Sequence, residues 1–233
     1  MKSLKIITIL ATFLFSSCSE LQQVVNQLPQ TISNAYIAAG LKEALDFGID
    51  KQVAKLTLED GFYKNELVKI GMPKELQKVD KTLRDIGLGN LADQGLKALN
   101  RAAENAVKEA TPIFVDAVKG ITFNDAKNIL LGTDNAATQY LQSKTSDALY
   151  DKFNPVIKNS FAKVGADQIW ENIILKYNTI PFVNKVNPDL TDYVTQEALT
   201  GVFTMIAVEE KEIRTKVSSR TTSLLQRVFA LQD

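Results

Sequence analysis

The sequence predicts an all-α protein, a single bundle-like domain of about eight or nine helices that follows a short leader. Strong helix formers dominate from residue 33 onward, and capping residues interrupt them at intervals. No strand-like alternation of apolar and polar residues is longer than four positions, and no hairpin signal is present. Apolar residues also recur in alternating steps of three and four, which is typical of a helix packed along a neighbour. The residues of this seam are Leu96, Leu99, Ala103, Ala106, Ala110, Ile113 and Ala117.

The chain begins with the layout of a bacterial lipoprotein signal peptide, which we assign to residues 1–17. Lys2 and Lys5 precede an apolar run that is too short to span a bilayer, for which about 20 residues are needed. Two serines then lead to Cys18, the only cysteine. We expect Cys18 to be lipidated and to become the first mature residue. An ordinary signal peptide that leaves a free thiol is the alternative.

The residue after the cysteine bears on the location of the mature protein. Ser19, and not aspartate, follows Cys18, which by analogy with the sorting rules of enteric bacteria favours the outer membrane. We therefore expect the protein in the bacterial cell envelope, attached to the membrane through its lipid. Residues 18–32 are polar and rich in glutamine, and predict a tether to an all-α domain at residues 33–233.

Helix boundaries in the first part of the domain follow from capping residues. Ser33 or Asn34 is expected to cap a helix that runs to about Leu56. Pro73 is placed at the first turn of the next helix, where proline is tolerated, and Gly87 is placed to end it.

A kink and a capping box are predicted in the middle of the chain. Pro112 lies within the seam and should kink that helix, because its ring displaces a backbone hydrogen bond. Thr122 and Asp125 have the spacing of a capping box for a helix through Leu131. Asp134 is expected to cap the next helix, which should end near residue 153.

The last third of the chain contains the longest predicted interruption. Pro155 is expected to restart a short helix to about residue 164, and another helix should cover residues 167–178. The segment 178–190 contains two prolines and has no helical pattern. Helix is expected to resume over residues 191–214, and a last helix should cover residues 221–230.

Composition excludes several classes of function. The chain has no histidine, which excludes imidazole bases and zinc sites built from histidine and cysteine. An enzyme is therefore less expected, and would depend on carboxylate, lysine, tyrosine or hydroxyl chemistry. Without Lys2 and Lys5 the mature chain has 25 basic side chains against 27 acidic ones. That balance predicts no nucleic acid partner. No sequence motif indicates a metal or another cofactor.

Many short segments, in order along almost the whole mature chain, resemble one bacterial family. They are residues 40–45, 60–63, 100–104, 114–117, 122–126, 136–140, 193–195, 198–199, 201–203 and 220–222. Together they resemble the DUF4197 domain, which is usually found in lipoproteins. Val217 departs from the pattern, which has a proline there. The resemblance implies the helical fold and the envelope location, but no catalytic residue, because the function of the family is unknown.

Two predicted loops contain candidate binding residues. In the first, Asp60, Phe62 and Tyr63 lie in a turn whose aromatic rings form either an exposed contact surface or a cover for the core; the cover is the favoured interpretation. The second loop combines polar side chains with two prolines and could bind a ligand. Alternatively, its polar residues serve only to form turns and to cap a helix. Its candidate residues are Asn178, Phe182, Asn187 and Asp189.

Charged residues supply the remaining candidates. Arg101, Asp116 and Arg220 are expected to take part in internal pairs, with an anion-binding pocket as the alternative. The acidic cluster at residues 209–212 could hold a metal. We favour instead pairs at i,i+4 from Glu210 to Arg214 and from Glu212 to Lys216.

The most expected function is that of a non-catalytic envelope lipoprotein that binds or scaffolds another envelope protein. Its partners would be the membrane, through lipidated Cys18, and that envelope protein. A carrier or sensor of a small apolar ligand inside the bundle is the alternative, and a carboxylate- or lysine-based enzyme is the third possibility.

Overall fold

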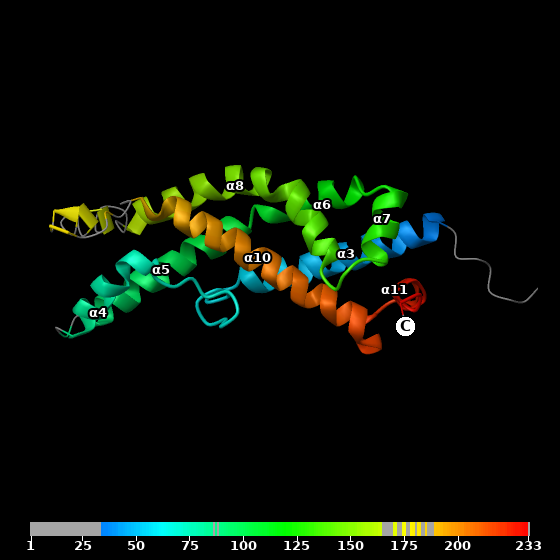
Figure 1. Cartoon of the computed structure of the whole chain (residues 1–233), viewed down its shortest axis with the longest axis horizontal. Helices are drawn as coiled ribbons and strands as arrows, with labels where there is room; N and C mark the ends of the chain where they lie inside the picture. Colours follow the sequence, from blue (N-terminus) through cyan, green and yellow to red (C-terminus); the bar gives the residue numbers. More distant parts are fainter. Residues whose placement is uncertain are drawn as a thin grey trace, which may run out of the picture.

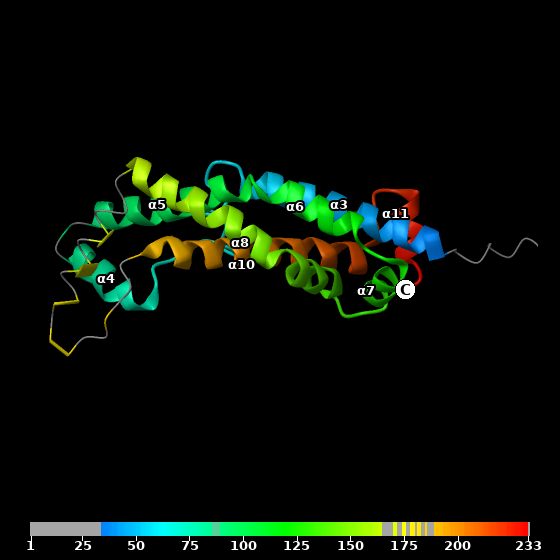
Figure 2. The same cartoon turned by 90° about the horizontal axis from the view of Figure 1, so that it is seen from above.

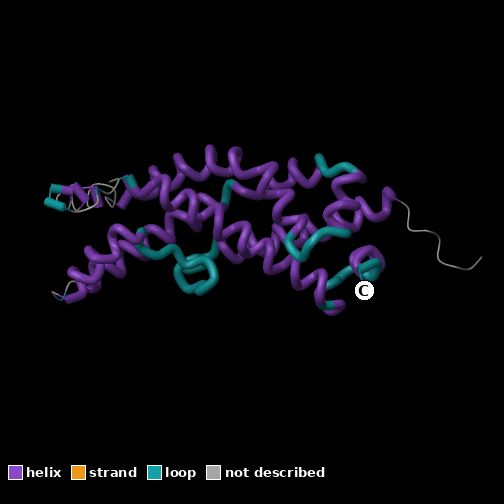
Figure 3. The backbone as a smooth tube through the Cα atoms, in the orientation of Figure 1, coloured by secondary structure: helices purple, strands orange, loops and turns teal. Residues whose placement is uncertain are grey.

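All regular secondary structure is helical within the part of the chain described by the computed structural model (Figure 3). The structure describes residues 34–85, 87, 89–164, 170–171, 174–175, 178–179, 181–182, 185 and 189–232. These residues form eight α-helices and two short 3₁₀ helices and contain no strand, so the all-α prediction is confirmed. The leader, Cys18 and the tether lie outside the described residues. The elements are α3 (Asn34–Leu56), η1 (Lys74–Leu76), α4 (Gln77–Asp85), α5 (Gly89–Val107), α6 (Ala110–Lys119), α7 (Phe123–Leu130), α8 (Ala136–Val164), α10 (Leu190–Thr215), η2 (Val217–Ser219) and α11 (Ser223–Phe229).

The helices form an elongated bundle (Figures 1 and 2). Helices α3 and α5 follow one another along the long axis, and α10 packs against both of them and against α8. The start of α3 lies with α7 and α11 at one end, whereas α4 and the start of α5 lie at the other. No helix in the described ranges combines the length and apolar character needed to cross a bilayer.

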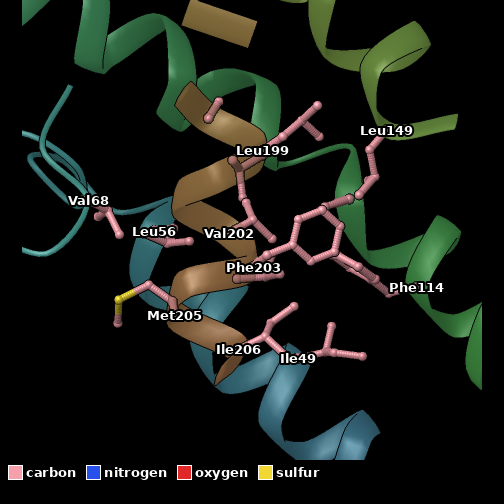
Figure 4. Close-up of a cluster of buried hydrophobic side chains, with 14 of the residues drawn as sticks. Ile49, Leu56, Val68, Phe114, Leu149, Leu199, Val202, Phe203, Met205 and Ile206 are labelled. Atoms are coloured by element: carbon pink, nitrogen blue, oxygen red, sulfur yellow. The ribbon is translucent and has the colours of Figure 1, made fainter. Parts of the chain in front are cut away.

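The core is built around α10, whose buried side chains meet those of α3, α6 and α8 (Figure 4). Phe203 on α10 meets Phe114 on α6 edge to face, with ring centroids 6.0 Å apart and planes at 85°. Each fully buried side chain of this size stabilises the fold by about 1.5–3 kcal/mol relative to an exposed one. The fold therefore depends on the side chains that α10 buries.

The seam does not form one kinked helix. Helix α5 ends at Val107 and α6 begins at Ala110, so the expected kink at Pro112 is replaced by a complete break. Pro112 is the third residue of α6, where the backbone N–H has no partner within a helix. The break places the proline in a first turn, where its missing N–H costs nothing, and this is why the kink prediction was wrong.

Pro155 does not restart a helix either, because α8 runs through it without interruption. Phe153, Ile157 and Phe161 are buried at four-residue steps on both sides of the proline. This continuous apolar face outweighs the roughly 3 kcal/mol that an internal proline costs a helix. The helix begins at Ala136, so the prediction that Asp134 caps it was wrong.

Other predicted boundaries are confirmed. Thr122 and Asp125 form a capping box at the start of α7, and Gly87 follows α4 with a left-handed φ of +83°. The helix expected at residues 167–178 lies largely outside the described residues. Val217, which departs from the family pattern, begins η2.

Candidate functional site

Residues 57–72, which follow α3 and end one residue before Pro73 leads into η1, form a series of turns that we call the clamped loop. It protrudes beside the middle of the bundle (Figure 1). Asp60 has a left-handed φ of +65°, and its carbonyl accepts a hydrogen bond from the Lys64 amide at 3.0 Å. Gly61 lies against the end of α3, where an added Cβ would be 2.5 Å from the Lys55 carbonyl oxygen. The close approach of the backbones therefore requires glycine there.

The aromatic residues of the clamped loop differ in exposure. Phe62 is fully buried, and an added Cβ on Gly201 of α10 would lie 2.7 Å from its ring. The core-cover interpretation is therefore confirmed for Phe62, and the exposed aromatic surface is not formed by it. Tyr63 is half-buried, with the Lys69 ammonium 4.7 Å from the centre of its ring.

Two buried polar residues of α5 fix the backbone of the clamped loop. The Asn100 side chain accepts a hydrogen bond from the Ile70 amide and donates one to the Ile70 carbonyl, both at 2.8 Å. The Glu104 carboxylate accepts a hydrogen bond from the Phe62 amide at 3.2 Å. Both side chains are buried, so these contacts replace hydrogen bonds that water cannot supply.

A partly exposed network of ion pairs also fixes the clamped loop. Arg101 contacts Glu104 at 2.6 Å, Glu59 at 2.9 Å and Asp60 at 3.5 Å. The pKa of Asp60 is lowered, first by its hydrogen bond with Lys64 and then by the neighbouring cations. The structure therefore joins two predicted residues, Asp60 and Arg101, and confirms the internal pairing expected for Arg101.

The clamped loop presents apolar side chains that the sequence analysis did not select. Leu58 is 64% exposed and Leu67 is 63% exposed. Asn100 and Glu104 were also missed as site residues, although one signal was available. They lie at i,i+4 beside the alanine seam, where a polar side chain at a buried position needs a partner from outside its helix.

Asp116 is not part of an internal pair, contrary to prediction. Its side chain is exposed on α6, with Lys119 at 3.9 Å. It borders an open surface hollow of about 480 Å³ between α6 and α8, which Tyr140 and Lys144 also line. Burial, followed by the charge of Asp125, raises the pKa of Tyr140.

The second predicted loop is described only in part. Asp189 accepts a hydrogen bond from the Thr191 amide at 2.8 Å and caps α10. This agrees with the alternative that the polar residues of this loop form turns and caps. Phe182 is fully exposed with a φ of +66°, and Asn178 is half-buried. Asn187 lies outside the described residues.

Arg220 has a structural position at the end of α10. It is buried, and its guanidinium donates to the carbonyls of Ile213 at 3.0 Å and Arg214 at 2.9 Å. These are the last carbonyls of a helix, which have no partner within it. The arginine therefore stabilises the turn into η2.

The acidic cluster at residues 209–212 forms the predicted ion pairs. Arg214 lies 2.8 Å from Glu210, and Lys216 lies 2.7 Å from Glu212. Glu210 is buried and also accepts the backbone amides of Ala137 and Thr138, so it caps α8 from a neighbouring helix. Within the described part of the chain, no group of three or more acidic or cysteine side chains is placed to hold a metal ion.

A small cavity lies in the core between α3, α8 and α10. Ile49, Ala137 and Ile206 line it together with the Glu210–Arg214 pair. Its volume of about 20 Å³ has room for a single water molecule, whereas ligand pockets usually have about 300–1,000 Å³. This cavity therefore does not favour a carrier of an apolar molecule.

Fold and site together define an all-α domain whose best-formed surface feature is a loop fastened by buried polar contacts. A family model described as a protein of unknown function, DUF4197, matches residues 31–230. The chain therefore belongs to the DUF4197 family. Comparisons with curated proteins and with solved structures gave no match.

Proposed function

We propose that the protein is a lipid-anchored protein of the bacterial envelope that binds another envelope protein through the clamped loop. The signal peptide layout and the lone Cys18 support the anchor, and Ser19 supports the outer membrane. The binding role depends on one observation: Leu58 and Leu67 are exposed on a loop whose backbone is fixed from within by Asn100 and Glu104.

The energetic argument concerns preorganisation. Burying an exposed leucine in an interface gains about 1.5–3 kcal/mol. A flexible loop would lose part of that gain, because fixing its backbone costs about 1–2 kcal/mol for each residue that becomes ordered. The hydrogen bonds to Ile70 and Phe62 already order the clamped loop in the free protein. Its leucines can therefore contribute most of their transfer free energy to binding.

Site-specific crosslinking in living cells tests this proposal. A photoreactive amino acid is introduced in place of Leu58 or Leu67, and at Leu131 as a control with similar exposure of 66%. We expect one protein to be captured from the two loop positions and not from position 131. Leu67→Ser should abolish capture from position 58, whereas Leu175→Ser, at a position that is 48% exposed, should leave it unchanged. Equal capture from all three positions would contradict a specific loop interface.

The anchor has its own test. Metabolic labelling with a fatty acid should mark the wild-type protein, and Cys18→Ser should remove the label and leave the leader uncleaved. A wild-type protein with a free thiol at Cys18 would refute lipidation without bearing on the loop.

A further inference from the structure

Three exposed apolar residues follow helices that end at the same end of the bundle. Leu131 is 66% exposed, Val217 is 61% exposed and Leu231 is 49% exposed. Each follows the last turn of a different helix, respectively α7, α10 and α11. These helix ends lie together at the end of the long axis where α3 begins (Figures 1 and 2).

Buried hydrogen bonds fix this end of the bundle. Arg214 donates to the carbonyls of Ile129 at 2.8 Å and Leu130 at 3.1 Å, so α10 holds the end of α7. The Gln232 side chain also donates to the Leu130 carbonyl, which places the residues after α11 beside those after α7. The apolar side chains are thus presented on a defined surface.

The chain from Cys18 enters the domain at the same end. Helix α3 starts at Asn34, and α11 packs against its first half, where an added Cβ on Gly40 would be 2.5 Å from Val228. Fifteen residues, 19–33, lie between the lipidated cysteine and the first residue of α3. Fully extended they reach at most about 55 Å, so the membrane that holds the lipid lies within reach of this end.

Exposed basic side chains also lie at this end, together with the exposed carboxylate of Asp134. Lys127 and Arg227 lie in the last turns of α7 and α11, and both are exposed. Lys211 is exposed near the end of α10. Basic side chains beside exposed apolar ones are typical of protein surfaces that rest in the headgroup region of a bilayer.

We propose that this end of the bundle rests on the lipid surface, with Leu131, Val217 and Leu231 in contact with the headgroup region. The inference rests on the lipid anchor of the proposed function. Helix α10, which is about 39 Å long from its 26 residues, then extends away from the membrane. In this orientation the clamped loop, beside the middle of the bundle, is held away from the lipid and free to meet a protein.

Fluorescence quenching in vesicles tests this orientation. Because lipidation consumes Cys18, a cysteine introduced by Leu131→Cys, Leu231→Cys or Lys81→Cys is the only free thiol of the full mature protein. Lys81 is exposed on α4 at the opposite end and serves as the control. Each variant receives an environment-sensitive fluorophore and is placed in vesicles of phosphatidylethanolamine and phosphatidylglycerol that contain a headgroup-labelled nitroxide lipid. We expect labels at positions 131 and 231 to be quenched about threefold or more relative to the label at position 81.

The outcomes separate the orientation from the anchor. Equal quenching at all three positions, in a protein that carries the lipid, would overturn the orientation alone. A label at position 131 that is shielded from aqueous iodide in detergent, but not quenched by the nitroxide lipid, would show that another part of the chain or a second copy covers this end. That result would also overturn the inference. A parent protein whose Cys18 reacts with the thiol reagent would overturn the anchor, and the inference with it.

Discussion

Asn100 and Ile70 are joined by a reciprocal pair of hydrogen bonds in which the side-chain amide of Asn100 takes the place of a second peptide group. Both contacts measure 2.8 Å, and both residues are fully buried. The pair fastens the clamped loop to α5 across thirty residues of sequence. Together with the contact from Glu104 to Phe62, it fixes the surface that we propose for binding.

The first prediction concerns this pair. Asn100→Leu keeps the volume of the side chain but leaves the amide and the carbonyl of Ile70 buried without a partner, so the free energy of unfolding should fall by about 2–4 kcal/mol. Urea denaturation measures this loss, and trypsin cleavage in the clamped loop should become faster in the same variant. Asn128→Leu, on an exposed position of α7, is the control and should change stability by less than about 0.5 kcal/mol. A loss below about 1 kcal/mol for Asn100→Leu would show that water replaces the side chain.

The second prediction concerns the packing of the Phe62 ring against Gly201 on α10. Gly201→Ala would place a Cβ 2.7 Å from the Phe62 ring and 3.3 Å from the Val68 Cβ. The clamped loop must then shift, and we expect a loss of about 1–3 kcal/mol in stability, together with weaker partner capture. Gly71→Ala is the matched control, because nothing lies within 4 Å of its added Cβ. If the two variants unfold at the same urea concentration, the Phe62 ring is not closely packed against Gly201.

Sequence patterns predicted the helices well where each cap and apolar face was local. The capping box of Thr122 and Asp125 is an interaction over three residues, and α3 buries apolar side chains at regular steps up to its last residue, Leu56. The effects of Pro112 and Pro155 were harder to predict from the sequence, because they depend on tertiary packing. Pro112 is accommodated by a break, and Pro155 by a helix whose buried face continues past it.

The candidate site was only partly predictable for a related reason. The pairing of Arg101 followed from its alanine surroundings, but its partners Glu59 and Asp60 lie some forty residues away in sequence. Leu58 and Leu67 could not be selected from sequence, since leucine is among the residues most often buried and no local pattern signals that these two are exposed. Exposure there depends on how α5 and α10 hold the loop.

The third prediction compares two ion pairs of equal spacing on α10. Glu210 and Arg214 are buried, whereas Glu212 and Lys216 are partly exposed. Arg214→Met leaves the Glu210 carboxylate buried without its cation, so the loss should be about 3–5 kcal/mol. Lys216→Met should cost about 0.5 kcal/mol or less, because solvent screens that pair. Both values come from urea denaturation, and similar losses for the two variants would mean that burial does not set the strength of these pairs.

The last prediction concerns acid stability and the cap of α7. Hydrogen bonds from the hydroxyl and the amide of Thr122 lower the pKa of Asp125 below its ordinary value of 3.8. The unfolded chain therefore binds a proton at a higher pH than the folded one does. The stabilisation that this carboxylate provides is fully present above pH 3.8 and is lost as the pH falls through the lower folded pKa.

Asp125→Asn should consequently reduce stability at neutral pH and flatten the decline at acid pH, so that variant and wild type converge near the folded pKa. Urea denaturation at a series of pH values measures both curves. Asn124→Ala, an exposed neighbour that does not titrate, should leave the shape of the acid decline unchanged. A constant stability difference between Asp125→Asn and the wild type at every pH would mean that the cap acts through geometry and not through the charge of Asp125.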